Sequence, residues 1–169
     1  MTMNLYILRH GIAVEPGTAG YEKDADRPLT PEGERKLLQI AEAMESLDLT
    51  FDLILSSPYL RARQTAEIVA ESLKARKRLE FSDCLTPGGN PKKLIEIINR
   101  LQPPPQNVLL VGHEPYLSGL ISLLVSGDAS LALVMKKGGL CKLSTGSLKP
   151  GRCAALEWLL TPKQMALMA

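Results

Sequence analysis

The chain has 169 residues, enough for one ordinary globular domain, and its 45% hydrophobic and 22% charged residues argue against intrinsic disorder. Its net charge of +2 is too small for a nucleic-acid binder with a strong basic face, and no stretch approaches the roughly 20 apolar residues that span a bilayer. We therefore expect a single domain over residues 1–169, with no nucleic-acid or membrane partner.

Short apolar runs alternate along the chain with segments of helical apolar spacing. Four of those segments begin where a capping residue precedes proline, which fits the first helical position. These pairs are Thr30-Pro31, Ser57-Pro58, Asn90-Pro91 and Thr161-Pro162. In chain order, the pattern predicts a strand at 5–8, a helix at 31–47, a strand at 53–55, helices at 58–75 and 91–101, a strand at 108–111, a helix from near Pro115, strands around 140–143 and 154–158, and a helix at 162–168.

The first three predicted strands lack polar alternation, which is typical of strands buried on both faces of a sheet. Helices between such strands imply parallel pairing with right-handed crossovers. The last two strands alternate more and are expected to be outer strands. The proline-rich stretch 102–106 is too short to link two domains. The sequence thus predicts an α/β fold: one domain, a three-layer α/β/α sandwich with a mostly parallel central sheet.

The cysteines and the first residues indicate a cytoplasmic protein. Cys84, Cys141 and Cys153 are odd in number and widely spaced, which predicts reduced thiols rather than a disulfide framework. The opening MTMNLYILRHG has no basic start and too short an apolar run for a signal peptide. Two histidines with scattered cysteines give no metal-ligand spacing, and no P-loop pattern is present. We expect neither a metal nor a cofactor.

The two histidines of the chain occupy equivalent places. His10 ends the run LYILRHG, and His113 ends VLLVGHEP. Because ligands of open α/β sheets bind at the carboxyl ends of strands, both imidazoles are expected at the same edge of the sheet. A glycine beside each, Gly11 and Gly112, would let the backbone turn sharply or approach a ligand closely.

Arginines accompany the histidines at that edge. Arg9 ends a run that otherwise reads as buried, so its guanidinium is expected to meet a carboxylate or a ligand. Arg61 lies just past the second strand, where it fits either a ligand site or a structural ion pair; Arg63 is expected on a solvated helix surface. Planar guanidinium groups match phosphoryl oxygens, and a neutral imidazole can attack phosphorus. The other ring nitrogen of His10 would then donate to a fixed acceptor, which we expect near Gly11.

Gly33 lies three residues into the helix predicted at 31–47. Glycine there costs about 1 kcal/mol relative to alanine. A close backbone contact at Gly33 would explain the residue, as would a frayed first turn.

Four motifs resemble the histidine phosphatase superfamily, also called phosphoglycerate-mutase-like: LRHG at 8–11, DRPLTPEG at 26–33, SSPYLRARQTA at 56–66 and VGHEP at 111–115. Their order and spacing match up to about residue 120. The length and the details RHGIA and DRPLT look most like the small branch typified by the bacterial phosphohistidine phosphatase SixA.

The resemblance implies roles for the residues already singled out. His10 would be the nucleophile that forms a covalent phosphohistidine intermediate. Arg9, Arg61 and His113 would complete the catalytic phosphate pocket, and Gly11 would belong to the substrate-binding residues.

The sequence departs from the broader superfamily where many members carry a glutamate that acts as the general acid. That position falls on Thr86 or Pro87, and Asp83, Glu15 and Glu114 are weak alternatives. A poor leaving group such as an alkoxide needs an acid, whereas a phosphoramidate can leave as imidazole with less help.

Three functions are therefore open. The first is a protein phosphohistidine phosphatase of the SixA type, whose partner would be a phosphorylated protein such as a histidine-phosphotransfer domain. The second is a phosphatase of small phosphate esters, whose partner would be a phosphorylated metabolite. The third is a phosphoprotein-binding module without turnover, against which the intact RHG motif argues, because a binder has no need of His10.

Overall fold

A computed structural model describes residues 2–169, and its elements follow the predicted alternation. The strands are β1 (Met3–Arg9), β2 (Leu53–Ser56), β3 (Leu79–Phe81), β4 (Asn107–Gly112), β5 (Leu140–Thr145) and β6 (Ala154–Leu160). The α-helices are α1 (Pro31–Ser46), α2 (Leu60–Ser72), α3 (Pro91–Asn99), α4 (Tyr116–Ser126) and α5 (Pro162–Ala166). Three short 3₁₀ turns are η1 (Asp24–Asp26), η2 (Arg76–Arg78) and η3 (Asp83–Leu85). No helix within residues 2–169 combines the length and the apolar character needed to cross a membrane.

The strands form one sheet in the order β3-β2-β4-β1-β5-β6. The pairs β2–β3, β2–β4 and β1–β4 are parallel, whereas β5 is antiparallel to both of its neighbours. Five strands therefore run one way, which confirms the predicted mostly parallel sheet. Of the two expected outer strands, β6 forms the edge and β5 lies next to it.

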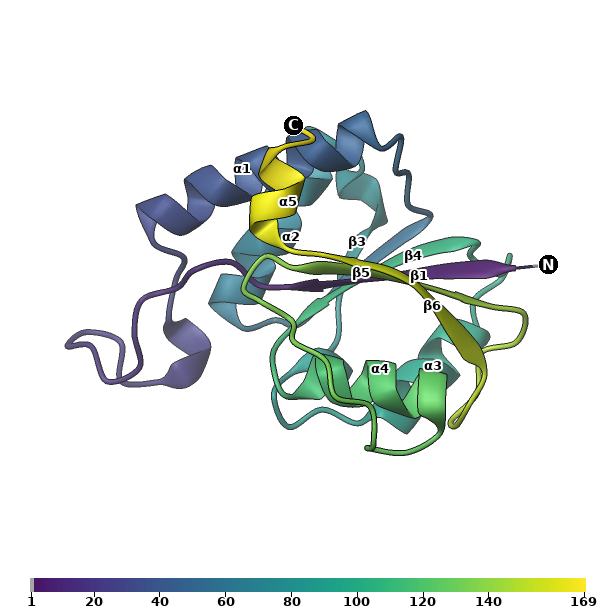
Figure 1. Ribbon diagram of the computed structural model, residues 1–169. Coiled ribbons are helices and arrows are strands. Elements are labelled where there is room, and N and C mark those ends of the chain that lie inside the picture. The colour runs from purple at the N-terminus through teal and green to yellow at the C-terminus, as the bar shows by residue number, and fades with distance from the viewer. Residues whose placement is uncertain (1) are drawn as a thin grey trace.

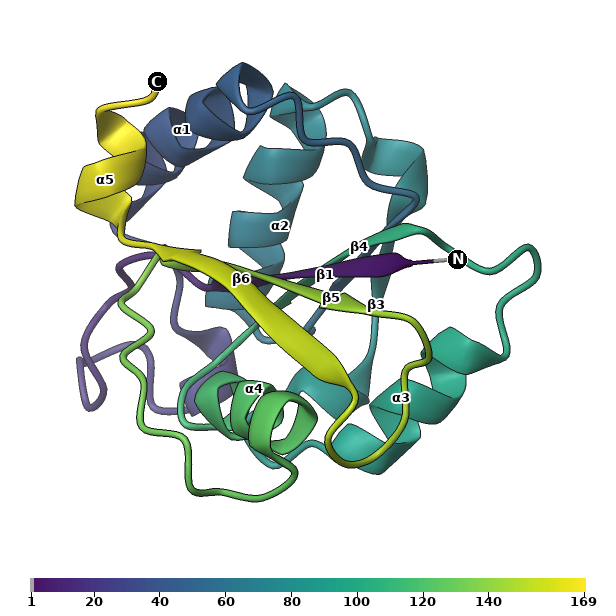
Figure 2. The ribbon, with the colours of Figure 1, turned by 45° about the vertical axis from the view of Figure 1, so that its right-hand side comes forward.

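Helices cover both faces of the sheet, as the sandwich prediction requires. Figures 1 and 2 show α1, α2 and α5 on one face and α3 and α4 on the other. Strand β1 contributes to both cores by alternation: Leu5 and Ile7 belong to the cluster that includes α3 and α4, while Tyr6 and Leu8 belong to the cluster that includes α1 and α2. All four side chains are buried, so β1 has no solvent-exposed face there.

Three of the four predicted helix caps are present. The side chains of Thr30, Asn90 and Thr161 accept backbone N–H groups of α1, α3 and α5, and each of these helices begins at the predicted proline. Helix α2 instead begins at Leu60, two residues later than predicted. Tyr59 is the N-cap residue of α2 and makes no side-chain cap bond, so the cap prediction at Ser57 is wrong. Oγ of Ser57 instead accepts the N–H of Tyr59 at 3.2 Å, ahead of the helix, and bonds His113 at 2.8 Å.

Gly33 lets α1 pack closely against the segment that follows β1. A Cβ atom on Gly33 would lie 2.1 Å from the carbonyl oxygen of Ile12. The same oxygen accepts the N–H of Thr30 at 2.9 Å, and Thr30 caps the N–H of Gly33 at 3.0 Å. The close backbone contact expected at Gly33 is thereby confirmed, and the contact fixes the chain two residues beyond His10.

Candidate active site

His10 and His113 lie side by side at the carboxyl edge of the sheet. Their strands are parallel neighbours, with Arg9 in register with Gly112, and the N–H of His10 donates to the carbonyl of Gly112 at 3.0 Å. The ring centroids are 5.2 Å apart, and the two residues are only 6% and 1% exposed. Adjacent strand ends therefore bring the two imidazoles together, as the sequence predicted.

Hydrogen bonds fix the tautomer of His10. Its Nδ1 lies 2.7 Å from the carbonyl oxygen of Gly11, and a carbonyl can only accept, so Nδ1 carries the proton. The unprotonated Nε2 accepts from Nε of Arg61 at 3.3 Å. The acceptor predicted near Gly11 is present, and the Nε2 lone pair faces the guanidinium of Arg61.

The surroundings keep both imidazoles neutral at physiological pH. Burial lowers the pKa of His10 to about 3; the bond to Gly11 raises it, and the positive charges of Arg61, Arg9 and Lys137 lower it further. Burial and then the charge of Arg61 likewise lower the pKa of His113 to about 3. A neutral His10 keeps the lone pair that nucleophilic attack on phosphorus requires.

Arg61 is the buried cation of the site. It is 4% exposed, and its Nη1 and Nη2 donate to the backbone and side-chain oxygens of Asp24 at 2.8 and 3.0 Å. Arg61 therefore contacts both His10 and the carboxylate of Asp24. The first contact fits a role in a ligand site and the second fits a structural ion pair, the two roles that the sequence left open. Arg63 is half exposed and pairs with Glu67, as expected for the solvated face of α2.

Asp24 is a site residue that sequence reasoning missed. Its Oδ1 accepts from Nε and Nη2 of Arg27 at 3.0 and 2.8 Å, and its Oδ2 accepts from Arg61. Burial acts to raise the pKa of Asp24, but the bonds and charges of the two arginines outweigh burial, and the pKa lies below its usual value. An ionised carboxylate thus occupies guanidinium donors that a phosphoryl group could use.

Arg9 and His113 each have one buried side-chain nitrogen without a hydrogen-bond partner in the described chain. Nη1 of Arg9 donates to the carbonyl of Met135 at 2.8 Å, and the charge of Glu114 acts on the guanidinium. Nε2 of His113 lies 2.8 Å from Oγ of Ser57. Nε of Arg9 and Nδ1 of His113 are buried and have no partner within residues 2–169. Unpaired buried polar atoms are costly, so they point to a ligand with acceptor or donor oxygens.

The two glycines beside the histidines serve packing. A Cβ on Gly11 would lie 2.7 Å from Cδ1 of Leu37, and one on Gly112 would lie 3.2 Å from Cδ2 of Leu117. Neither glycine has a positive φ. The two glycines therefore make room for the helices of the two layers, and neither uses the left-handed backbone region that glycine alone adopts freely.

The weak acid candidates have other surroundings. Oε1 of Glu114 accepts the N–H of Ser118 at 2.8 Å in the first turn of α4, and its charge acts on Arg9. Glu15 and Asp83 are exposed. Tyr59 is a further neighbour that sequence reasoning missed: its ring lies 5.3 Å from that of His113 and 5.5 Å from the guanidinium carbon of Arg61.

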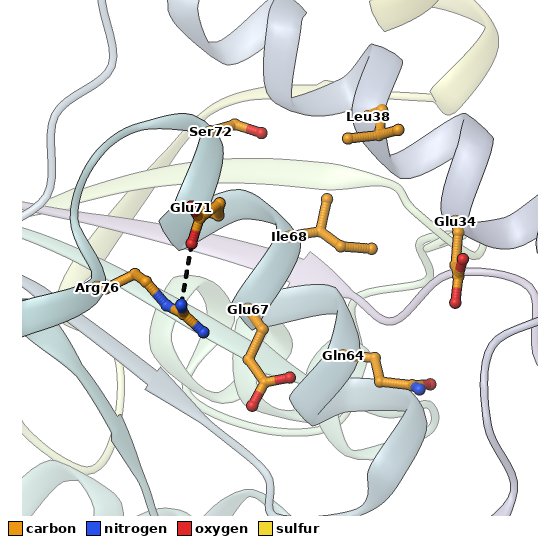
Figure 3. A pocket seen from close by; sticks show the side chains of 8 residues that line it. All are labelled: Glu34, Leu38, Gln64, Glu67, Ile68, Glu71, Ser72 and Arg76. Atoms are coloured by element: carbon orange, nitrogen blue, oxygen red, sulfur yellow. Dashed lines mark ion pairs between the residues drawn. The ribbon is translucent and has the colours of Figure 1, made fainter.

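A groove of about 420 Å³ between α1 and α2 is not the phosphate site (Figure 3). It is lined by three glutamates, Glu34, Glu67 and Glu71, the last of which pairs with Arg76 at 3.2 Å. Its negative charge would repel a phosphoryl dianion. The histidine edge of the sheet is the better anion site.

Comparison with known proteins identifies the family of this chain. Residues 5–86 match the model of the histidine phosphatase superfamily (branch 1). An uncharacterised protein of Picosynechococcus sp. is 37% identical over 148 residues, which cover 87% of this chain and 88% of the relative. The chain belongs to the histidine phosphatase superfamily.

Within this superfamily the chain falls in the SixA-type branch. Phosphohistidine phosphatase SixA of Escherichia coli is 29% identical over 127 residues, which cover 75% of this chain and 76% of SixA. The solved structure of the protein histidine phosphatase SixA complexed with tungstate has a TM-score of 0.78 at 25% identity and covers 95% of this chain and 98% of its own. The fold predicted from the sequence is thereby confirmed.

Proposed function

We propose that this histidine phosphatase hydrolyses protein phosphohistidine, with His10 as the nucleophile and Arg9, Arg61 and His113 forming the phosphate pocket. Gly11 would border the pocket, where its carbonyl orients His10 and its N–H donates to Oγ1 of Thr65. The observation that carries the proposal is the state of His10. Its proton is held on Nδ1 by the Gly11 carbonyl, its Nε2 lone pair faces Arg61, and it is neutral in its surroundings.

The reaction has two steps. First, Nε2 of His10 attacks phosphorus, the bond between phosphorus and the substrate's imidazole nitrogen breaks, and that nitrogen takes up a proton from solvent. A water molecule then attacks the phosphoryl group on His10, releases inorganic phosphate and returns the imidazole to its neutral form. The guanidinium groups of Arg9 and Arg61 would stabilise the charge on the equatorial oxygens in both steps.

The surroundings of the acid candidates support a phosphoramidate substrate. An alkoxide leaving group needs a donor, yet Glu114 accepts the N–H of Ser118 and Asp24 is held ionised by two arginines. Glu15 and Asp83 are exposed and, within the described chain, form no ion pair with His10, Arg9, Arg61 or His113. The imidazole of phosphohistidine is a better leaving group and needs less help. A phosphorylated histidine on a protein, as on a histidine-phosphotransfer domain, is therefore the preferred partner over a small phosphate ester.

The test compares turnover of free phosphohistidine with turnover of a panel of sugar phosphates by the purified protein. We expect kcat/KM at least about tenfold higher for phosphohistidine. A clear preference for a sugar phosphate would overturn the substrate assignment in favour of the small-molecule phosphatase.

The His10→Ala variant is the matched control for the nucleophile. Its phosphate release is expected to fall to the uncatalysed level, while phosphate still binds at the arginines. A wild-type protein that binds phosphohistidine but releases no phosphate would be the binding module instead.

A further inference from the structure

A basic cleft adjoins the candidate active site. It encloses about 490 Å³ beside Arg9. Every charged residue that lines it within the described chain is cationic: Arg9, Lys36, Lys136, Lys137 and Lys163. These cations come from the end of β1, from α1, from the turn before β5 and from α5, so the tertiary fold gathers them.

The turn that carries two of these lysines is bonded to the catalytic strand end. Nη1 of Arg9 donates to the carbonyl of Met135 at 2.8 Å. The N–H of Gly138 lies within hydrogen-bond distance of the carbonyls of Arg9 and His10, at 3.0 and 3.1 Å. The backbone of Lys136 and Lys137 therefore has a fixed position next to the attacking imidazole.

The charges of the cleft are largely unmatched within the protein. Lys36 pairs with Glu32 at 3.2 Å, whereas Lys136, Lys137 and Lys163 form no ion pair with any described residue and are exposed. Positive charges gathered in one cleft repel one another and make the local electrostatic potential positive, which attracts anions. Such an arrangement favours association with an acidic partner.

We propose that this basic cleft docks an acidic segment of the phosphorylated protein substrate while the phosphohistidine enters at His10. The inference rests on the proposed function and deepens it. A compact phosphate is usually recognised by planar guanidinium groups and buried donors. Lysines on flexible stems, exposed and spread over several elements, suit several carboxylates on a protein surface, where charge complementarity raises the association rate.

The groove on the other side of α1 has the opposite charge to the basic cleft. The groove in Figure 3 is lined by three glutamates, Glu34, Glu67 and Glu71, and by one cation, Arg76, so its net charge is negative and would repel the same partner. Helix α1 thus separates an acidic groove, reached by Glu34, from the basic cleft, reached by Lys36. An acidic substrate protein would be directed to the face that holds His10.

The experiment uses two synthetic phosphohistidine peptides, one flanked by glutamates and the other by glutamines. At low salt we expect kcat/KM about tenfold higher for the glutamate peptide, and this preference should shrink as ionic strength rises. The double variant Lys136→Glu/Lys163→Glu should lose the preference, yet hydrolyse free phosphohistidine within about twofold of the wild-type rate, since neither lysine contacts the reacting atoms.

The control double variant is Lys77→Glu/Lys149→Glu. It makes the same change in net charge with exposed lysines that precede β3 and β6. Both strands run in the same direction as β1, so these lysines lie at the amino ends of the strands, away from the carboxyl ends that hold His10. It should keep the preference for the glutamate peptide. Equal turnover of the two peptides by the wild type, or an unchanged preference in Lys136→Glu/Lys163→Glu, would overturn the docking proposal.

Binding of the unphosphorylated glutamate peptide, measured by fluorescence anisotropy, separates the two proposals. Wild-type binding that is lost in Lys136→Glu/Lys163→Glu supports docking even if phosphohistidine is not hydrolysed, in which case only the proposed function fails. Absence of wild-type binding, together with normal hydrolysis of free phosphohistidine, contradicts docking alone.

Discussion

The substitution Gly33→Ala tests how α1 is held against the active-site segment. In an ordinary helix, replacing glycine by alanine adds about 1 kcal/mol of stability, because glycine loses more backbone entropy on folding. At Gly33 the added Cβ would lie 2.1 Å from the carbonyl oxygen of Ile12, a backbone atom that cannot rotate away. The two effects have opposite signs, so the measured sign identifies the dominant one.

The contacts indicate that the clash dominates. Overpacking costs about 1 to 3 kcal/mol, and movement of Ile12 would also weaken its bond from the N–H of Thr30, worth about 1 kcal/mol. Set against the helix gain of about 1 kcal/mol, the expected result is a net loss of about 1 to 3 kcal/mol in the free energy of unfolding. Displacement of Ile12 should also lower turnover, because His10 lies two residues away.

Urea denaturation of the wild type and the variant measures this difference. Gly119→Ala is the matched control: Gly119 lies within α4, is exposed, and nothing lies within 4 Å of its added Cβ. We expect the control to be as stable as the wild type or up to about 1 kcal/mol more stable. A Gly33→Ala protein that is equally stable or more stable would refute the proposed packing of α1.

Three further predictions concern the candidate site. Arg61→Ala should lower kcat for phosphohistidine about hundredfold or more, measured by phosphate release, because it removes a donor to the transition state; a loss below tenfold would argue for a purely structural Arg61. NMR signals of His10 and His113 should not titrate between pH 8 and 5. Unfolded histidines bind protons below about pH 6.5, whereas these two bind them only near pH 3 in the folded protein. The free energy of unfolding should therefore fall as the pH drops from about 6.5 toward 3, by about 1.4 kcal/mol per pH unit for each histidine. Asp24→Asn removes a competing anion and should tighten inorganic phosphate binding by up to about fivefold in calorimetry, a small effect because Asp24 is half exposed; weaker binding would contradict the competition.

Local patterns predicted that the two histidines lie at the same edge of the sheet. His10 and His113 each end a run of apolar residues, and parallel strands place such ends together whatever the remaining topology. The acceptor for the His10 ring was predictable because it belongs to the next residue, Gly11. The close approach at Gly33 was visible as a glycine in the first turn of a helix, where another residue would be favoured.

Features that depend on long-range contacts escaped prediction. Asp24 meets Arg61 across 37 positions only because the segment after β1 folds back over the site. Ser57 has the sequence signature of a helix cap, but α2 begins two residues later than that signature predicts, and the bond of Ser57 to His113, 56 positions away, could not be predicted from local sequence. Strand β3 has three residues, too few for a recognisable apolar run, and was not predicted.

Trapping the phosphoenzyme tests the central claim, which is phosphoryl transfer to His10. The protein is mixed with phosphohistidine substrate, quenched in alkali to preserve the phosphoramidate, and examined by mass spectrometry and ³¹P NMR. The hydrogen bond from Nδ1 to Gly11 predicts a phosphoryl group on Nε2 of His10 and none in His10→Ala. A phosphoryl group on another residue, or on Nδ1 of His10, would contradict it.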